Sequence, residues 1–145
     1  MPSPVVSLHA DLVRIPSLSF QEKPAADHVE AFLRGVDGVE VLRHDENVVA
    51  SLGHGDDVLL LCSHLDVVPP SQGHPYPPFT PTTVGRAVYG RGAVDAKASG
   101  AAMLTALATL AASGWRPPRT GRRCGTRGWS AWPSSPRPRP GSART

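Results

Sequence analysis

The fold is decided by residues 58–70, which read VLLLCSHLDVVPP. The apolar run at 58–63 is typical of a strand that lies inside a sheet and is covered on both faces. His64 and Asp66 follow directly, so both side chains are expected at the carboxyl end of that strand, where α/β proteins place their ligands. Histidine and carboxylate side chains are common metal ligands. A lone histidine here could also be a hydrogen-bonded residue at a strand end.

A second carboxylate is presented about thirty residues later. Residues 87–89 read as a short strand, which continues into Gly90-Arg91-Gly92 and then into Asp95, where a helix begins. Two such presentations in one chain favour a metal site made of His64 and Asp95 over a structural role for His64 alone. Arg91 and Lys97 are interpreted as residues that fix this loop to the rest of the domain, with charges just outside the metal ligands as the alternative.

The remaining pattern is that of an α/β domain with a mixed β-sheet flanked by helices. Apolar residues recur at helical spacing after Ser3-Pro4, again from about Pro24, and over 96–113. Strands are expected at 39–42, 48–52 and 58–63, and the proline-rich residues 69–85 are expected to form an ordered Ω-like loop. Cys62 is expected to be a small buried residue, with a thiolate ligand as the alternative. The other histidines are expected at the surface, with His74 near the mouth of the site.

Charge divides the chain into two parts. All 12 acidic residues lie in residues 1–115, whereas residues 116–145 contain eight arginines and no acidic residue. We therefore expect a domain at 1–118 and a disordered tail rich in arginine and proline at 119–145. Its composition is what a GC-rich gene yields when read out of frame; the alternative is a basic arm that binds nucleic acid or a protein partner. No targeting or membrane-spanning segment is recognised, so a cytoplasmic protein is expected.

Three segments together resemble one enzyme family. They are LLLCSHLDVVPP at 59–70, HPYPPF at 74–79 and VYGRGAVDAKASGAAML at 88–104, preceded by Ile15-Pro16-Ser17 with Glu22. They resemble the N-terminal part of the zinc-dependent amidohydrolases and exopeptidases that include acetylornithine deacetylase, succinyl-diaminopimelate desuccinylase, aminoacylase and carboxypeptidase G. The resemblance covers roughly residues 5–118 and implies part of a three-layer catalytic domain.

The resemblance also implies roles for individual residues. His64 would bind one zinc ion, Asp66 would be the catalytic carboxylate that holds the other ring nitrogen of His64, and Asp95 would bridge two zinc ions. Zinc is the expected metal, with cobalt as a substitute. The substrate would be an N-acyl amino acid or a short peptide, and an acetylornithine deacetylase-like reaction is preferred. The complete enzyme is expected to be a homodimer that binds neither membrane nor nucleic acid.

The family's catalytic glutamate pair and later ligands should follow residue 118, but residues 119–145 contain no Asp, Glu or His. The sequence thus predicts the N-terminal part of a dinuclear zinc hydrolase, inactive as this chain alone. The alternative is a non-catalytic chain whose basic tail binds nucleic acid or a partner.

Overall fold

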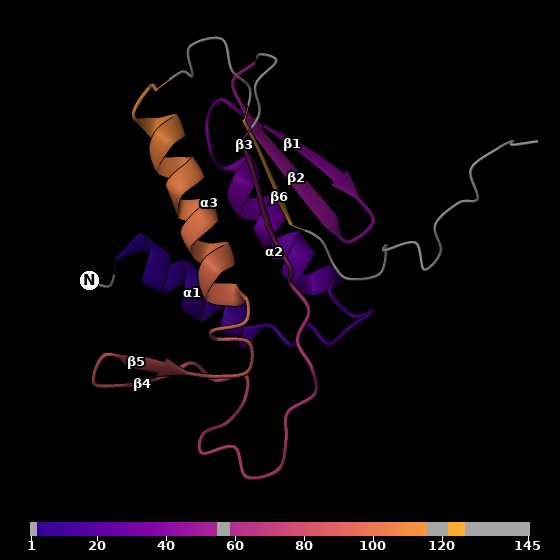
Figure 1. Ribbon diagram of the computed structural model, residues 1–145, viewed down its shortest axis with the longest axis vertical. Coiled ribbons are helices and arrows are strands. Elements are labelled where there is room, and N and C mark those ends of the chain that lie inside the picture. Colours follow the sequence, from indigo (N-terminus) through magenta and orange to yellow (C-terminus); the bar gives the residue numbers. More distant parts are fainter. Residues whose placement is uncertain (1–2, 55–58, 116–121, 127–145) are drawn as a thin grey trace, which may run out of the picture.

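Figure 1 shows the computed structural model of the chain, which describes residues 3–54, 59–115 and 122–126. The first two elements are the helices α1 (Pro4–Arg14) and α2 (Lys23–Arg34). The other elements in chain order are β1 (Val39–His44), β2 (Asn47–Leu52), β3 (Leu59–Ser63), β4 (Thr82–Val84), β5 (Ala87–Tyr89), α3 (Lys97–Ala112) and β6 (Arg122–Thr126).

The three helices form where apolar spacing predicted them. Helix α1 has Pro4 at its first position and buries Leu8, Leu12 and Val13. Helix α3 is made almost wholly of alanine, leucine and other good helix formers. It buries Leu104, Leu107 and Ala111, whereas Leu110, which the apolar pattern places on the inward face, is 39% exposed. The helices therefore confirm the sequence reasoning, except at the last turn of α3.

The larger sheet has the strand order β1-β2-β6-β3. Strands β1 and β2 form an antiparallel hairpin, β2 also pairs antiparallel with β6, and β3 pairs parallel with β6. The mixed sheet is confirmed. Two predictions were wrong: within the described residues β3 lies at an edge rather than inside the sheet, and residues 122–126 of the tail form a strand. The backbone of β6 pairs with strands on both sides, and this pairing does not require apolar side chains. The rest of the predicted disordered tail, residues 119–121 and 127–145, lies outside the described residues.

The core lies on one face of this sheet. Alternate residues of β2, Val48, Ala50 and Leu52, are buried in one cluster with side chains from all three helices. Leu42 and Leu60 lie on the other face and are 63% and 62% exposed. Of the expected three layers, the described residues thus supply the sheet and one layer of helices.

Cys62 is exposed, so the prediction of a buried cysteine was wrong. The strand register explains this result, because Cys62 and Val49 both lie opposite Gly125. Val49 lies opposite Leu42 in turn. Cys62 is therefore on the face of the sheet away from the helices.

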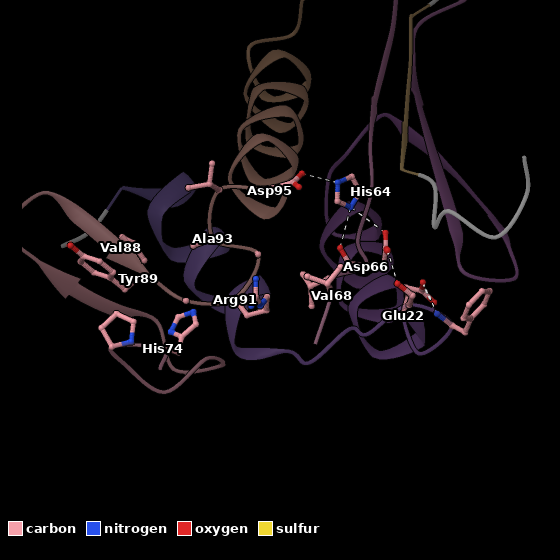
Figure 2. Close-up of a pocket in the computed structure, with 17 residues that line it drawn as sticks. Glu22, His64, Asp66, Val68, His74, Val88, Tyr89, Arg91, Ala93 and Asp95 are labelled. Carbon is pink, nitrogen blue, oxygen red and sulfur yellow. Dashed lines mark hydrogen bonds and ion pairs between the residues drawn. The ribbon is translucent and has the colours of Figure 1, made fainter. Parts of the chain in front are cut away.

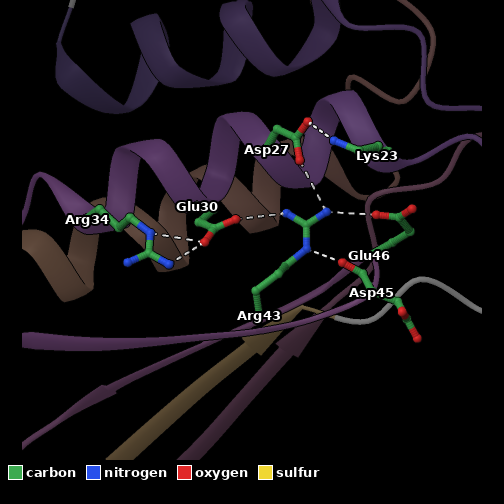
Figure 3. A network of polar contacts seen from close by, with 7 residues as sticks. All are labelled: Lys23, Asp27, Glu30, Arg34, Arg43, Asp45 and Glu46. Atoms are coloured by element: carbon green, nitrogen blue, oxygen red, sulfur yellow. Dashed lines mark hydrogen bonds and ion pairs between the residues drawn. The ribbon is translucent and has the colours of Figure 1, made fainter.

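Arg43 joins the β1–β2 hairpin to α2, as Figure 3 shows. Its guanidinium group is within 3.2 Å of Glu30, 3.3 Å of Asp27 and 2.7 Å of Glu46. Only 17% of the Arg43 side chain is exposed. The hydrogen bond from Lys23, together with the charges of Lys23 and Arg43, holds the pKa of Asp27 below its ordinary value, despite the opposing effect of burial. This cluster fixes the position of the hairpin on the helix.

Residues 69–81 contain no helix or strand, but the predicted loop ends earlier than expected because 82–84 form β4. Strands β4 and β5 pair in a separate antiparallel hairpin. In Figure 1 this hairpin lies beyond the end of α3 at which that helix begins. Among the described residues, no helix has the length and apolar character needed to cross a membrane.

Candidate metal centre

The chain beyond β3 is held in an extended form by the segment that follows α1. The hydroxyl group of Ser17 donates to the carbonyl of Leu65 at 2.6 Å, and the backbone N–H of Val67 donates to the carbonyl of Ser17 at 2.8 Å. Leu65 and Val67 are buried, whereas His64 points the other way and remains partly exposed. This alternation presents His64 at the end of the strand, as the sequence predicts.

Two glycines bring the second carboxylate close to the first segment. A Cβ atom at Gly90 would lie 2.4 Å from Val13 Cγ1, and a Cβ atom at Gly92 would lie 2.4 Å from Val67 Cγ1. Gly92 also has a φ of +75°, which favours glycine. The backbone can therefore pass against α1 and beside Val67 before it reaches Asp95 only because these side chains are absent.

Figure 2 shows His64 between two carboxylates. Its Nε2 atom is 2.9 Å from Asp95 Oδ1. Its Nδ1 atom is 3.1 Å from the carbonyl oxygen of Asp66 and 3.2 Å from Asp66 Oδ1. Only the carbonyl contact has hydrogen-bond geometry, so Asp66 Oδ1 is buried without a hydrogen-bond partner. The structure thus brings together all three residues that the sequence singled out: His64, Asp66 and Asp95.

The protonation of His64 reflects these neighbours. Burial lowers the pKa of the imidazole, but the hydrogen bond to Asp95, the hydrogen bond to the Asp66 backbone and the two negative charges outweigh that effect. The pKa of His64 is therefore raised above its ordinary value. The carboxylates around this ring stabilise positive charge at its position, whether that charge is a proton or a metal ion.

Three polar contacts here were not predicted from the sequence. Ser19 donates its hydroxyl proton to Asp66 Oδ2 at 2.9 Å. The Nε2 atom of His9 is 2.7 Å from the carbonyl oxygen of Ala93, so His9 is not a free surface residue. Lys97 Nζ donates to the carbonyl of Ile15 at 2.7 Å, and its side chain is buried. Lys97 thus connects the start of α3 to the segment that follows α1, which supports the structural role preferred for it. No signal in the sequence could have indicated these three contacts, because each joins segments that lie far apart in the chain.

A pocket of about 830 Å³ opens beside these residues. Its polar lining includes His64, Asp66, Asp95, Glu22 and Arg91. His74 lines it too, as expected for the one histidine predicted near the mouth. The Asp95 side chain is 87% exposed and therefore faces an open space that a metal ion and a substrate could share.

The donor atoms fit part of a metal site. Nδ1 of His64 faces Asp66, so Nε2 is the nitrogen left to bind a cation, and the nearest carboxylate oxygen to it belongs to Asp95. In the parts of the chain that the structure describes, no group of three or more His, Cys, Asp or Glu side chains gathers around one such position. His64 and Asp95 could supply two ligands of a metal site, and the described residues supply no third ligand at that position.

Comparison with known proteins supports the resemblance seen in the sequence. Residues 60–122 match peptidase family M20/M25/M40, and this range contains His64, Asp66 and Asp95. Over this range the chain is similar to peptidase family M20. The M20 match begins in β3 and includes the whole of α3. It therefore spans both segments that present the candidate ligands.

Two curated relatives are succinyl-diaminopimelate desuccinylases. The enzyme from Corynebacterium glutamicum is 41% identical over 106 residues, which are 70% of this chain and 27% of that protein. The enzyme from Wolinella succinogenes is 34% identical over 110 residues, which are 73% of this chain and 30% of that protein. A metallo-carboxypeptidase of family M20 from Sulfolobus solfataricus has the same fold, with a TM-score of 0.70 and 23% identity, over 88% of this chain and 31% of that one. The chain thus spans less than a third of the length of these relatives.

Proposed function

We propose that this chain is the N-terminal part of a dinuclear zinc hydrolase that cleaves the amide bond of an N-acyl amino acid. The observation that carries the proposal is the approach of His64 Nε2 to Asp95 Oδ1 at 2.9 Å, at an open pocket and with Asp66 behind the imidazole. The match to family M20 and the similarity to two desuccinylases support a metal-dependent hydrolase.

His64 would bind one metal ion through Nε2, and Asp95 would bridge two ions, because a carboxylate offers two anionic oxygens. When bound, zinc supplies an activated water molecule and stabilises negative charge on an amide oxygen. Asp66 would keep the proton of the imidazole on Nδ1, which leaves the lone pair of Nε2 for the metal. Ser19 would hold the Asp66 carboxylate in place for this task.

The substrate remains a proposal. One candidate substrate is N-acetylornithine, as for an acetylornithine deacetylase. A second candidate is a succinylated amino acid, because the curated relatives are succinyl-diaminopimelate desuccinylases. A short peptide has the same amide group. As a homodimer in the cytoplasm, the complete enzyme would act on small molecules. The alternative of a nucleic-acid-binding tail concerns residues 119–145, of which the structure describes 122–126.

The test joins residues 1–118 to the remaining part of the Corynebacterium glutamicum desuccinylase. Zinc content and hydrolysis of N-succinyl-diaminopimelate and of N-acetylornithine are measured for this chimera, for Asp95→Asn and for Asp11→Asn as a matched control on the surface of α1. We expect about two zinc ions and hydrolysis of one substrate, both lost in Asp95→Asn only. Two zinc ions and full hydrolysis in Asp95→Asn would refute the assignment of Asp95 and with it the dinuclear site.

A further inference from the structure

The pocket beside the metal ligands contains a cationic side chain with no assigned partner. Arg91 lies in the turn between β5 and Asp95 and is half-buried. In Figure 2 it lies between the His64–Asp95 pair on one side and His74 on the other. Its backbone N–H donates to the carbonyl of Pro78 at 2.6 Å, so the start of the side chain is held in position.

The guanidinium group of Arg91 lacks a counter-charge. Among the described residues it forms no ion pair, and its Nε–H group is buried without a hydrogen-bond acceptor. A buried donor without an acceptor is destabilising. By contrast, three other arginines each form an ion pair with a carboxylate: Arg14, Arg34 and Arg43. The charge of Arg91 is therefore not neutralised by another described residue, and its guanidinium group can bind an anion that enters the pocket.

The surroundings of Arg91 differ from those of the metal ligands. His74 Nδ1 is 2.9 Å from the carbonyl oxygen of Tyr76, and a carbonyl can only accept, so Nδ1 carries a proton and Nε2 is the other polar atom of the ring. The ring of Tyr89 lines the pocket and packs against Tyr76, with the two ring centroids 4.9 Å apart. One side of the pocket is thus suited to a cation, and the other side to an anion attached to a small organic group.

We propose that Arg91 binds a carboxylate group of the substrate, on the side of the pocket away from the metal ligands. This inference rests on the proposed function, because it names the substrate class of the same pocket. A guanidinium group matches a carboxylate through two parallel N–H bonds, and here the two Nη groups would supply them because Nε is buried. Phosphate sites usually gather several cationic groups, and Arg91 is the single lysine or arginine among the pocket-lining residues that the structure describes. A carboxylate is therefore the better fit.

The experiment uses the metal-free 145-residue chain, so that binding cannot be due to zinc. N-acetylglycine and its neutral counterpart N-acetylglycinamide are titrated while the ¹⁵N resonance of the Arg91 Nε–H group is followed, assigned by its loss in Arg91→Lys. We expect N-acetylglycine to shift this resonance to saturation and the neutral amide to leave it in place. Arg91→Met should weaken binding of N-acetylglycine at least tenfold, whereas Arg86→Met, an exposed arginine between β4 and β5, should leave binding unchanged.

Three results would overturn the inference: no shift with N-acetylglycine, equal shifts with both compounds, or unchanged binding in Arg91→Met. The comparison of the two compounds on the unmodified chain keeps the test valid even if a variant fails to fold. Failure here is distinct from failure of the proposed function, which depends on zinc content and hydrolysis in Asp95→Asn. If the chimera hydrolyses its substrate but N-acetylglycine does not shift the Arg91 resonance, this inference alone is refuted.

Discussion

Replacement of Gly92 by alanine should destabilise the chain through two separable effects. The first is conformational: φ is +75° at Gly92, and a residue with a Cβ atom in this region costs roughly 1–2 kcal/mol. The second is steric: the new Cβ atom would lie 2.4 Å from Val67 Cγ1 and 3.3 Å from Lys97 Cδ, and both side chains are buried. Overpacking of this kind costs roughly 1–3 kcal/mol. The sum is about 3 kcal/mol.

Gly73 is the matched control for this substitution. Its φ is +81°, close to that of Gly92, but nothing lies within 4 Å of a Cβ atom built there. Gly73→Ala should therefore cost only the conformational part, roughly 1 kcal/mol. At about 4 °C per kcal/mol for a domain of this size, Tm should fall by about 12 °C in Gly92→Ala and by about 4 °C in Gly73→Ala.

The assay is thermal unfolding followed by circular dichroism, with urea unfolding as a second measurement. Addition of Val67→Ala to Gly92→Ala removes the clashing methyl group, so the double variant should be more stable than the sum of the single effects by roughly 1 kcal/mol. Equal losses of Tm in Gly92→Ala and Gly73→Ala would show that the close approach of Gly92 to Val67 does not constrain the chain, and the reasoning would fail.

Three further predictions concern other contacts. Arg43→Met should lower the free energy of unfolding by about 2 kcal/mol, because it leaves three neighbouring carboxylates without their shared cation. Arg34→Met, at an exposed ion pair, should lower it by under roughly 0.5 kcal/mol. Urea unfolding of both variants measures these losses, and equal losses would contradict the prediction. Burial lowers the pKa of Lys97 from 10.5 to about 8, so the unfolded state binds more protons than the folded state between these two pH values. The free energy of unfolding should therefore rise with pH in this range, by up to about 1.4 kcal/mol per pH unit. Lys97→Met should remove this part of the slope, and an unchanged slope would exclude Lys97 as its source. In the chimera, Asp66→Ala should retain zinc but lower the zinc affinity or the rate of hydrolysis by roughly 10–100-fold. Ser19→Ala should act in the same direction, and Ser19→Thr should restore the lost affinity or rate because it keeps the hydroxyl group that binds Asp66. No effect of Ser19→Ala on zinc affinity would refute its positioning role.

Local patterns in the sequence were enough to predict the helices, the strands β1 and β2 and the three residues of the candidate site. Helical spacing and strand alternation are properties of neighbouring residues, and His64, Asp66 and Asp95 each follow a recognisable element. The prediction for Cys62 was wrong because burial depends on which face of the sheet the helices cover. That choice is not visible within the strand itself.

Contacts between distant segments could not be predicted. Residues 122–126 carry no apolar alternation, and they form β6 because two backbones, one on each side, offer hydrogen bonds. The contact between His9 and Ala93 joins residues 84 positions apart, and that between Ser19 and Asp66 joins residues 47 positions apart. Polar side chains such as these find their partners only once the chain has folded, so neither their identity nor their spacing reveals the contact.

The position of β6 between β2 and β3 has a consequence for synthesis on the ribosome. Within the described residues, β3 pairs with no strand of the larger sheet except β6, which begins 59 residues after Ser63. At roughly 5–20 residues per second, the nascent chain carries β3 for about 3–12 s before its partner strand is made. During that interval Leu59, Leu60 and Leu61 offer an unpaired apolar edge to other nascent chains. Translation speed between codons 64 and 122 therefore sets how long the strand that bears His64 is exposed to aggregation or to capture by chaperones.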